Sequence, residues 1–207
     1  MSISSLFASC VQRLSDLGVH VPAGSRFDIM RRCSEDKGGP VRTSIPTHDP
    51  NFRIALEALR DIQLLDAILR NIDKVDVGSV ALERLVRDPP LPHSGNISRG
   101  RDLQAELLVA AACVSGGMKN VRLTEPDVAA TIDEERWGIA VKRVKSQSRI
   151  TDNIKEAARQ AHEAHIPAAI YIDVSQALDP DDEQMITPMT DEAFNLRLRD
   201  GMRQAIR

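Results

Sequence analysis

Three charged residues, far apart in the sequence, stand in or beside apolar segments, where a buried charge is unfavourable unless it is paired or has a function. Lys142 ends the short apolar run "GIAV", Asp127 opens the run "DVAAT", and Glu106 begins the apolar stretch "ELLVAAACV". Buried carboxylates and ammonium groups are stabilised by pairing or by binding a metal. Carboxylate oxygens are the ligands that Mg²⁺ prefers, and a neighbouring lysine can orient the water that attacks a phosphodiester.

The periodicity of the chain predicts the elements that position these groups. Residues 101–117 read as a helix that carries Glu106 and ends at a glycine pair. Residues 120–144 contain three short strand-like runs, with "DEER" as a hairpin turn. Side chains alternate along a strand, so this hairpin would bring Asp127 and Lys142 to one face of a sheet.

Two further elements complete this half of the chain. Residues 150–165 read as a helix capped by Thr151 or Asp152. Residues 167–175, "PAAIYIDVS", read as a buried strand. The predicted order is therefore helix, three strands, helix and strand, which is a mixed α/β fold.

This order and its motif letters resemble the PD-(D/E)xK, or restriction-endonuclease-like, nuclease superfamily over about residues 98–175. Pro126-Asp127 matches the "PD" at the start of the second strand, and Lys142 matches the lysine of the third. Glu106 stands at the place of the family's helix acid, and Gln160 at that of the glutamine of the RecB-like branch. The resemblance implies a Mg²⁺ or Mn²⁺ site at Glu106 and Asp127, and Lys142 as the group that activates water.

The chain departs from the family pattern at one position, because the (D/E)xK tripeptide reads Ala140-Val141-Lys142. In one interpretation the second acid has moved to Glu156, fourteen residues after Lys142, as the resemblance to some restriction enzymes allows. In the other interpretation the site has lost catalysis, and the module binds nucleic acid without cutting it. Glu125 ranks below Glu156 as a replacement, since it would point to the opposite face of an extended strand.

Each candidate residue also has a purely structural interpretation. Asp127 follows a proline, as turn aspartates often do. Glu106 could pair with Arg101 or Arg99, and Glu156 could belong to a solvated helix face. We expect the functional interpretation to hold for the set only if the side chains converge.

A cluster of basic residues surrounds the third predicted strand and the helix after it. The whole chain has a formal net charge of −3, which gives no global signature of a nucleic-acid-binding protein. A local cluster could nevertheless neutralise phosphates and give salt-sensitive DNA binding. Its members are Arg136, Lys142, Arg143, Lys145, Arg149, Lys155 and Arg159.

Composition and the N-terminus narrow the class of protein further. No stretch of apolar residues is long enough to cross a membrane, and the first residues lack the features of a signal peptide. The three cysteines, odd in number and without a CxxC pair, favour a reducing cytoplasm over a disulfide framework. His162 and His165 lie three apart, without the zincin spacing or an evident third ligand.

The N-terminal half has a different pattern, and the segment 88–100, rich in Pro, Gly and Ser, predicts a boundary near residue 95. We expect a helical region over 1–95 and the nuclease-like domain over 96–207. The helical region would bind DNA, a protein partner or a second copy of the chain. The predicted helices outside the nuclease-like core are 3–17, 49–75, 78–88 and 190–206, with a loop over 21–50.

The sequence therefore predicts Mg²⁺-dependent DNA hydrolysis by an endonuclease in restriction, repair or phage defence. Asp127, Glu106 and Glu156 would be the metal ligands, Lys142 would act on water, and Gln160 would hold the site or the DNA backbone. The alternative is an inactive module of the same fold that binds nucleic acid or a partner within a larger complex. A third interpretation is a structural subunit in which the acid–lysine set is a coincidence.

Overall fold

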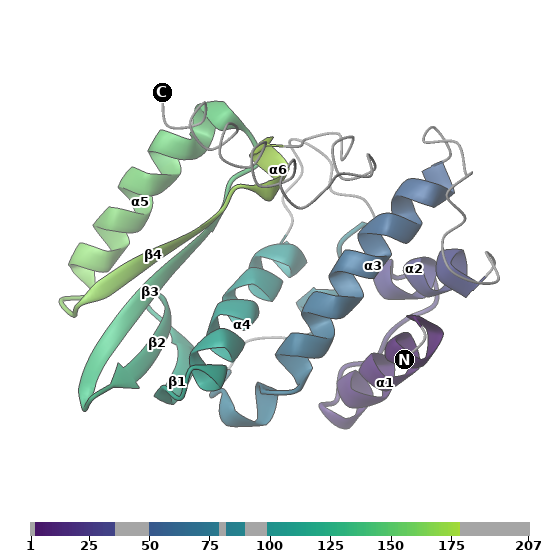
Figure 1. The fold of residues 1–207 in the computed structure, drawn as a ribbon, viewed down its shortest axis with the longest axis horizontal. Helices are drawn as coiled ribbons and strands as arrows, with labels where there is room; N and C mark the ends of the chain where they lie inside the picture. Colours follow the sequence, from purple (N-terminus) through teal and green to yellow (C-terminus); the bar gives the residue numbers. More distant parts are fainter. Residues whose placement is uncertain (1–2, 36–49, 79–81, 90–98, 179–207) are drawn as a thin grey trace, which may run out of the picture.

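The computed structural model describes residues 3–35, 50–78, 82–89 and 99–178 of the 207-residue chain. A four-stranded sheet lies between helix α5 (Ile150–Glu163) and helix α4 (Arg99–Ser115), as Figure 1 shows. The N-terminal helices pack on the far side of α4. The prediction of a mixed α/β fold is confirmed, and α4 forms its middle layer.

The sheet has the strand order β1-β2-β3-β4. The first three strands form an antiparallel meander, and β4 runs parallel to β3 after the crossover through α5. The strands are β1 (Lys119–Thr124), β2 (Asp127–Ile132), β3 (Glu135–Arg143) and β4 (Ala168–Asp173). These four strands match the runs that the sequence predicts.

The β2–β3 hairpin fixes the register between the strands that carry Asp127 and Lys142. Val128 pairs with Ile139 and Ala129 pairs with Gly138. A Cβ atom on Gly138 would stand 2.8 Å from Cδ of Pro126, so only glycine lets the proline ring lie against β3. The contact fixes the chain immediately before Asp127.

Helix α4 is buried on two sides because it separates the sheet from the N-terminal helices. Leu103 and Leu107 belong to the core that the N-terminal helices form. Val109, Ala110 and Cys113 pack instead with strand residues of the sheet. This double burial explains why the segment is apolar nearly all round, as its sequence predicts.

The N-terminal region differs from its prediction at two places. The residues expected to form a loop over 21–50 contain helix α2 (Arg26–Glu35), whose Phe27 and Met30 are fully buried. The many charged residues of α2 mask the short apolar stripe in the sequence, so the helix is not predicted. The helix expected over 78–88 is wrong in its described part, which is the 3-10 helix η2 (Leu82–Val86). The other elements here are α1 (Ile3–Asp16), α3 (Pro50–Leu69) and the 3-10 helix η1 (Ile72–Lys74).

Two predictions for the C-terminal half need correction. Strand β4 exists but is not buried, because it is the edge of the sheet, with Ile170 38% and Tyr171 40% exposed. Neither Thr151 nor Asp152 caps α5, since this helix continues from the 3-10 helix η3 (Gln147–Arg149) without a side-chain cap. After β4 the structure describes the short helix α6 (Ser175–Leu178), and the predicted helix 190–206 lies outside the described residues.

A buried charge network joins the N-terminal helices to α4. Arg26 lies 3.5 Å from Asp61 and donates a hydrogen bond to Gln104, and Arg101 lies 3.5 Å from the same Asp61. All four side chains are almost inaccessible to solvent. Burial lowers the pKa of Arg26, and the surrounding carboxylates oppose that change. The network ties the first half of the chain to the helix that carries Glu106.

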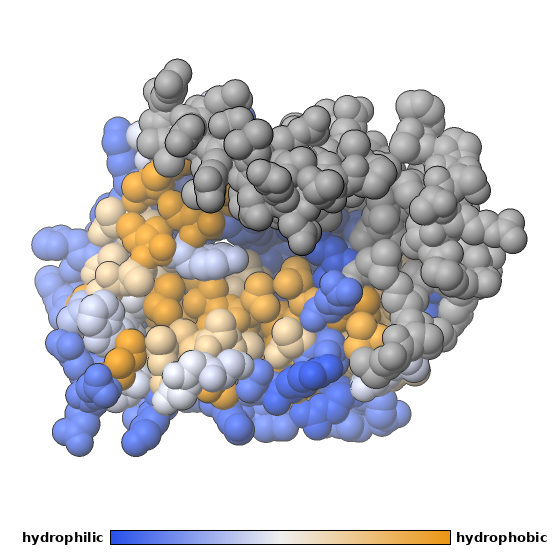
Figure 2. Space-filling view, viewed as in Figure 1, coloured by the Kyte–Doolittle hydropathy of each residue, from blue (hydrophilic) through white to orange (hydrophobic). Residues whose placement is uncertain are grey.

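No helix in the described ranges combines the length and the apolar character that crossing a membrane requires. The face of the molecule in Figure 2 has an apolar centre, over β4 and α4, with hydrophilic margins.

Candidate functional site

Asp127 and Lys142 lie together at one end of the sheet. Asp127 is the first residue of β2, and Lys142 is the penultimate residue of β3. Lys142 Nζ lies 3.7 Å from Asp127 Oδ2, and the two side chains are 17% and 18% exposed. The same carboxylate oxygen accepts a hydrogen bond of 2.7 Å from the backbone N–H of Val141. Their expected position on a shared face is confirmed.

Glu106 comes from helix α4, which packs on the face of the sheet opposite to Asp127 and Lys142, so it acts on this pair across the end of the strands. It follows Asp102 by four residues on the stripe of α4 that faces the sheet and continues through Val109 and Cys113. Burial and, second to it, the negative charge of Asp127 raise the pKa of Glu106 to about 7. Lys142 acts in the opposite direction. Glu106 is thus within electrostatic reach of both members of the pair.

The pKa of Asp127 is also raised by its surroundings. Burial raises its pKa above the ordinary value, although the Val141 N–H and Lys142 both favour the ionised form. The exposed Glu125 also raises this pKa. Two carboxyl groups with raised pKa values, one lysine and partial access to solvent make this end of the sheet the best candidate site of the described chain.

Residue 140, which holds the acid in the (D/E)xK pattern, is fully enclosed in this chain. Ala140 has no exposed surface, and it lies two residues before Lys142 on the same face of β3. The β2–β3 pairing ends at Val128 and Ile139, and one further step along the two strands leads to Asp127 and Ala140. An acidic side chain at residue 140 would therefore stand beside Asp127, and the methyl group of Ala140 occupies that place.

Glu156 and Gln160 lie on α5, and their environments differ. Glu156 is exposed, and both of its carboxylate oxygens bind Arg159, which lowers its pKa. Lys142 also lowers this pKa through its charge, so Glu156 lies near the site without joining it. Gln160 is partly buried, and its Oε1 has no hydrogen-bond partner among the described residues. The expected role of Glu156 as a third ligand stays a prediction.

The donor set fits an ion that needs few protein ligands. Within residues 3–35, 50–78, 82–89 and 99–178, no three acidic, histidine or cysteine side chains form a ready metal-binding group. Mg²⁺ is commonly held by one or two carboxylates, with waters and substrate phosphate completing its octahedron. Glu106 and Asp127 provide two such carboxylates. A bound cation would favour their ionised forms against the burial that raises both pKa values.

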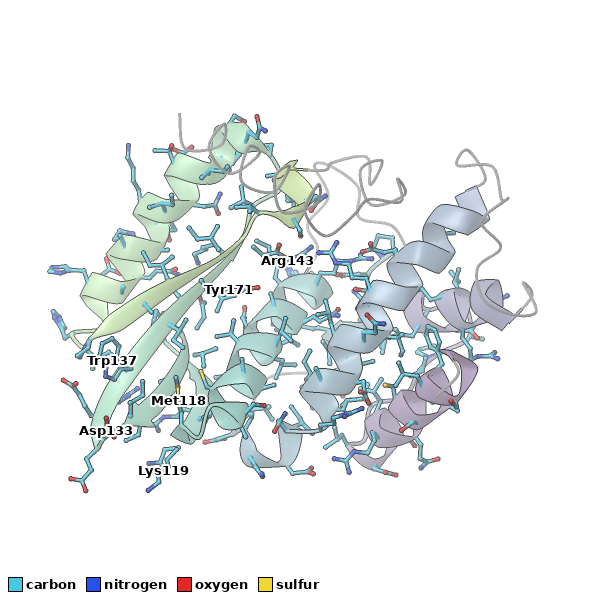
Figure 3. The ribbon with its side chains drawn as sticks, in the orientation of Figure 1. Met118, Lys119, Asp133, Trp137, Arg143 and Tyr171 are labelled. Atoms are coloured by element: carbon cyan, nitrogen blue, oxygen red, sulfur yellow. The ribbon has the colours of Figure 1, made fainter. Side chains whose placement is uncertain are left out.

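A second ion network, which the sequence does not reveal, holds the other face of β3 against α4. Arg143 follows Lys142 and therefore points to the opposite face. Its guanidinium lies 3.4 Å from Asp102 on α4 and 3.4 Å from Asp173 on β4. Figure 3 shows Arg143 beside Tyr171 at the ends of β3 and β4. Arg143 thus fixes the helix that carries Glu106 against the strand that carries Lys142.

The predicted basic cluster is only partly available to a ligand. Arg159 forms ion pairs with Glu156 and Glu163, and Arg143 is largely buried between its two partners. Arg149 and Lys155 are exposed near the start of α5. The surface beside Lys142 is therefore less basic than the sequence indicates.

A scan against protein-family models and searches of curated proteins and solved structures found no match for this chain. The functional argument is therefore carried by the geometry of the site.

Proposed function

We propose that this chain is a Mg²⁺-dependent nuclease that hydrolyses DNA phosphodiester bonds with a restriction-endonuclease-like core. The observation that carries the proposal is the convergence of Lys142 with Asp127 at 3.7 Å, beside a Glu106 whose pKa is about 7. Paired carboxylates that hold a divalent ion and a lysine that stabilises negative charge are groups suited to phosphodiester hydrolysis. The order of helices and strands around them supports the same fold type.

Glu106 and Asp127 would hold the ion, which when bound supplies positive charge against the phosphate and lowers the pKa of a coordinated water. The Val141 N–H keeps the Asp127 carboxylate oriented. Lys142 would orient the attacking water and donate hydrogen bonds to the phosphate oxygens as their negative charge increases. Water adds to phosphorus and the P–O bond to the leaving sugar oxygen breaks, which yields a phosphomonoester and a hydroxyl end.

Nicking of supercoiled plasmid in Mg²⁺ and in Mn²⁺ tests the proposal. We expect the wild-type chain to nick and both Asp127→Asn and Lys142→Met to lose this activity. Lys119→Met, which removes an exposed lysine at the start of β1, is the matched control and should nick as the wild type does. Wild-type protein that does not nick in either metal, or activity that survives both site substitutions, contradicts the proposal.

The second candidate function is a nucleic-acid-binding module that has lost catalysis. It is favoured by the enclosed Ala140 and by the ion pair that holds Glu156 against Arg159. In this case DNA binding persists in Asp127→Asn and Lys142→Met, and the wild-type chain cuts nothing. Ala140→Asp separates the two functions further, because a restored acid beside Asp127 should create metal-dependent nicking in a module that lacks only that ligand.

The role of Glu156 has its own matched test, because Glu156 and Glu163 both pair with Arg159. If Glu156 turns inward and binds the ion, Glu156→Gln reduces the Mg²⁺-induced rise in the melting temperature. Glu163→Gln removes a similar ion pair farther along the helix and should leave that rise unchanged. Equal behaviour of the two variants would assign Glu156 to the surface.

A further inference from the structure

We propose that Arg84 and Arg87, on the N-terminal side of the chain, bind nucleic-acid phosphates on the Glu106 side of the candidate site. The inference rests on the proposed function, which it deepens by assigning part of the DNA-binding surface to the N-terminal region. It also gives the helical region a function in substrate binding.

The 3-10 geometry of η2 places the two arginines together. A 3-10 helix has three residues per turn, so side chains at i and i+3 are eclipsed. Arg84 and Arg87 are three apart, and the backbone N–H of Arg87 bonds to the carbonyl of Arg84 at 3.2 Å. Both side chains are exposed, whereas Leu85 and Val86 between them are buried in the N-terminal core. The two guanidinium groups therefore extend from one side of an anchored turn.

This turn is held directly against the helix that carries Glu106. A Cβ atom on Gly100 would stand 2.2 Å from the carbonyl oxygen of Arg84, so only a glycine permits such close contact. Asp88 accepts hydrogen bonds from the backbone N–H groups of Gly100 and Arg101 at 3.1 and 2.7 Å. It thereby caps the first turn of α4 and fixes η2 there.

This contact places Arg84 close to the candidate site along the helix. Gly100, which the Arg84 carbonyl contacts, stands six residues before Glu106, less than two turns of α4 away. Neither arginine has a side-chain hydrogen bond or ion pair among the residues that the structure describes. A pair of unpaired arginines beside a partly open acidic site is suited to phosphate oxygens, which guanidinium groups bind in a bidentate manner.

On the side of the sheet away from α4, Arg149 and Lys155 are exposed near the start of α5 (Figure 1). The carboxylate–lysine group would then lie between two sets of cations, one from each half of the chain. A polyanionic backbone crossing the site can contact both sets, while an isolated phosphate can contact only one. The occupant that this arrangement favours is therefore a nucleic-acid strand.

The salt dependence of DNA binding measures the number of these contacts. Each phosphate contact adds about 0.9 to the slope of log affinity against log salt concentration for duplex DNA. Loss of two contacts would reduce the ratio of affinities at 50 and 200 mM salt by about 12-fold. Removal of charge far from the bound strand would leave this ratio almost unchanged.

Fluorescence anisotropy with a labelled 20-base-pair duplex, in EDTA so that no strand is cut, tests the inference on the full chain. We expect Arg84→Ala/Arg87→Ala to lower the affinity ratio by about 12-fold, and Arg84→Lys/Arg87→Lys to keep most of it. The control is Arg70→Ala, an exposed arginine that pairs with Asp66 at the end of α3. Both site arginines are exposed, so the variants should melt as the wild type does, and Arg84→Gln/Arg87→Gln repeats the test with larger side chains.

An unchanged ratio in the double alanine variant, an equal loss in Arg70→Ala, or a wild-type chain that does not bind the duplex overturns the inference. These results differ from a failure of the proposed function. If the chain binds DNA through Arg84 and Arg87 but never nicks plasmid, the binding surface is supported and the nuclease activity is contradicted. If the chain nicks plasmid but the double variant has an unchanged ratio of affinities at 50 and 200 mM salt, the nuclease activity is supported and this binding surface is contradicted.

Discussion

Replacing Glu106 by glutamine should stabilise the protein at alkaline pH, because it removes a charge that the fold disfavours. Burial and the charge of Asp127 raise the pKa of Glu106 from 4.5 to about 7. A carboxyl group whose pKa is raised by folding binds its proton more tightly in the native state. The free energy of unfolding therefore falls as pH rises from about 4.5 through 7, and the full penalty applies above pH 7.

The size of this penalty follows from the two pKa values. Their difference corresponds to an upper limit of about 3.4 kcal/mol. Glu106 is only partly buried, so solvent screening reduces the expected effect to about 1–2 kcal/mol. For a chain of this length, that gain corresponds to a melting temperature about 2–8 °C higher at pH 8. At pH 5 the native Glu106 keeps its proton, and the gain should shrink to a few tenths of a kcal/mol.

Urea unfolding of Glu106→Gln and wild type at pH 5 and pH 8 measures the effect. The control is Glu135→Gln, which changes an exposed glutamate of β3 and should have the same stability as the wild type at both pH values. A stabilisation of Glu106→Gln that is equal at the two pH values, or a destabilisation at pH 8, would refute the argument that Glu106 and Asp127 repel each other. Added Mg²⁺ should stabilise the wild type more than Glu106→Gln.

Two further substitutions test the supports of the site. Gly138→Ala places a Cβ atom 2.8 Å from Cδ of Pro126, and we expect a loss of about 1–3 kcal/mol in urea unfolding together with weaker metal binding. A variant as stable as the wild type would show that the proline contact is not required. Asp61→Asn removes the acid that Arg26 and Arg101 share, and should cost about 3 kcal/mol by thermal or urea unfolding. A loss below about 0.5 kcal/mol would show that the buried network contributes little.

The positions of Asp127 and Lys142 could be predicted from the sequence because they depend on local rules. Strand alternation and a short hairpin turn determine which side chains share a face, and both features are visible in the letters. Glu106 could be identified because an acid within an apolar helix requires a partner. Its pKa near 7 could not be predicted, since the value depends on the distance to Asp127 in the folded chain.

Features that depend on contacts between residues far apart in the chain could not be predicted from the sequence. Arg26 and Gln104 are 78 residues apart and meet inside the protein, so no periodicity reveals the network or the helix that supplies Arg26. The exposure of β4 has a similar explanation. An apolar strand gives the same pattern at the centre and at the edge of a sheet, and a helix face is assigned only when its neighbours are known.

The most direct test of the account is the anomalous scattering of a crystal soaked in Mn²⁺. We predict a peak that contacts carboxylate oxygens of both Glu106 and Asp127, close to Lys142, and that disappears in Asp127→Asn. Crystals that show no ion between these two carboxylates, or that hold Mn²⁺ only elsewhere on the protein, would contradict the central claim that the two groups share a cation.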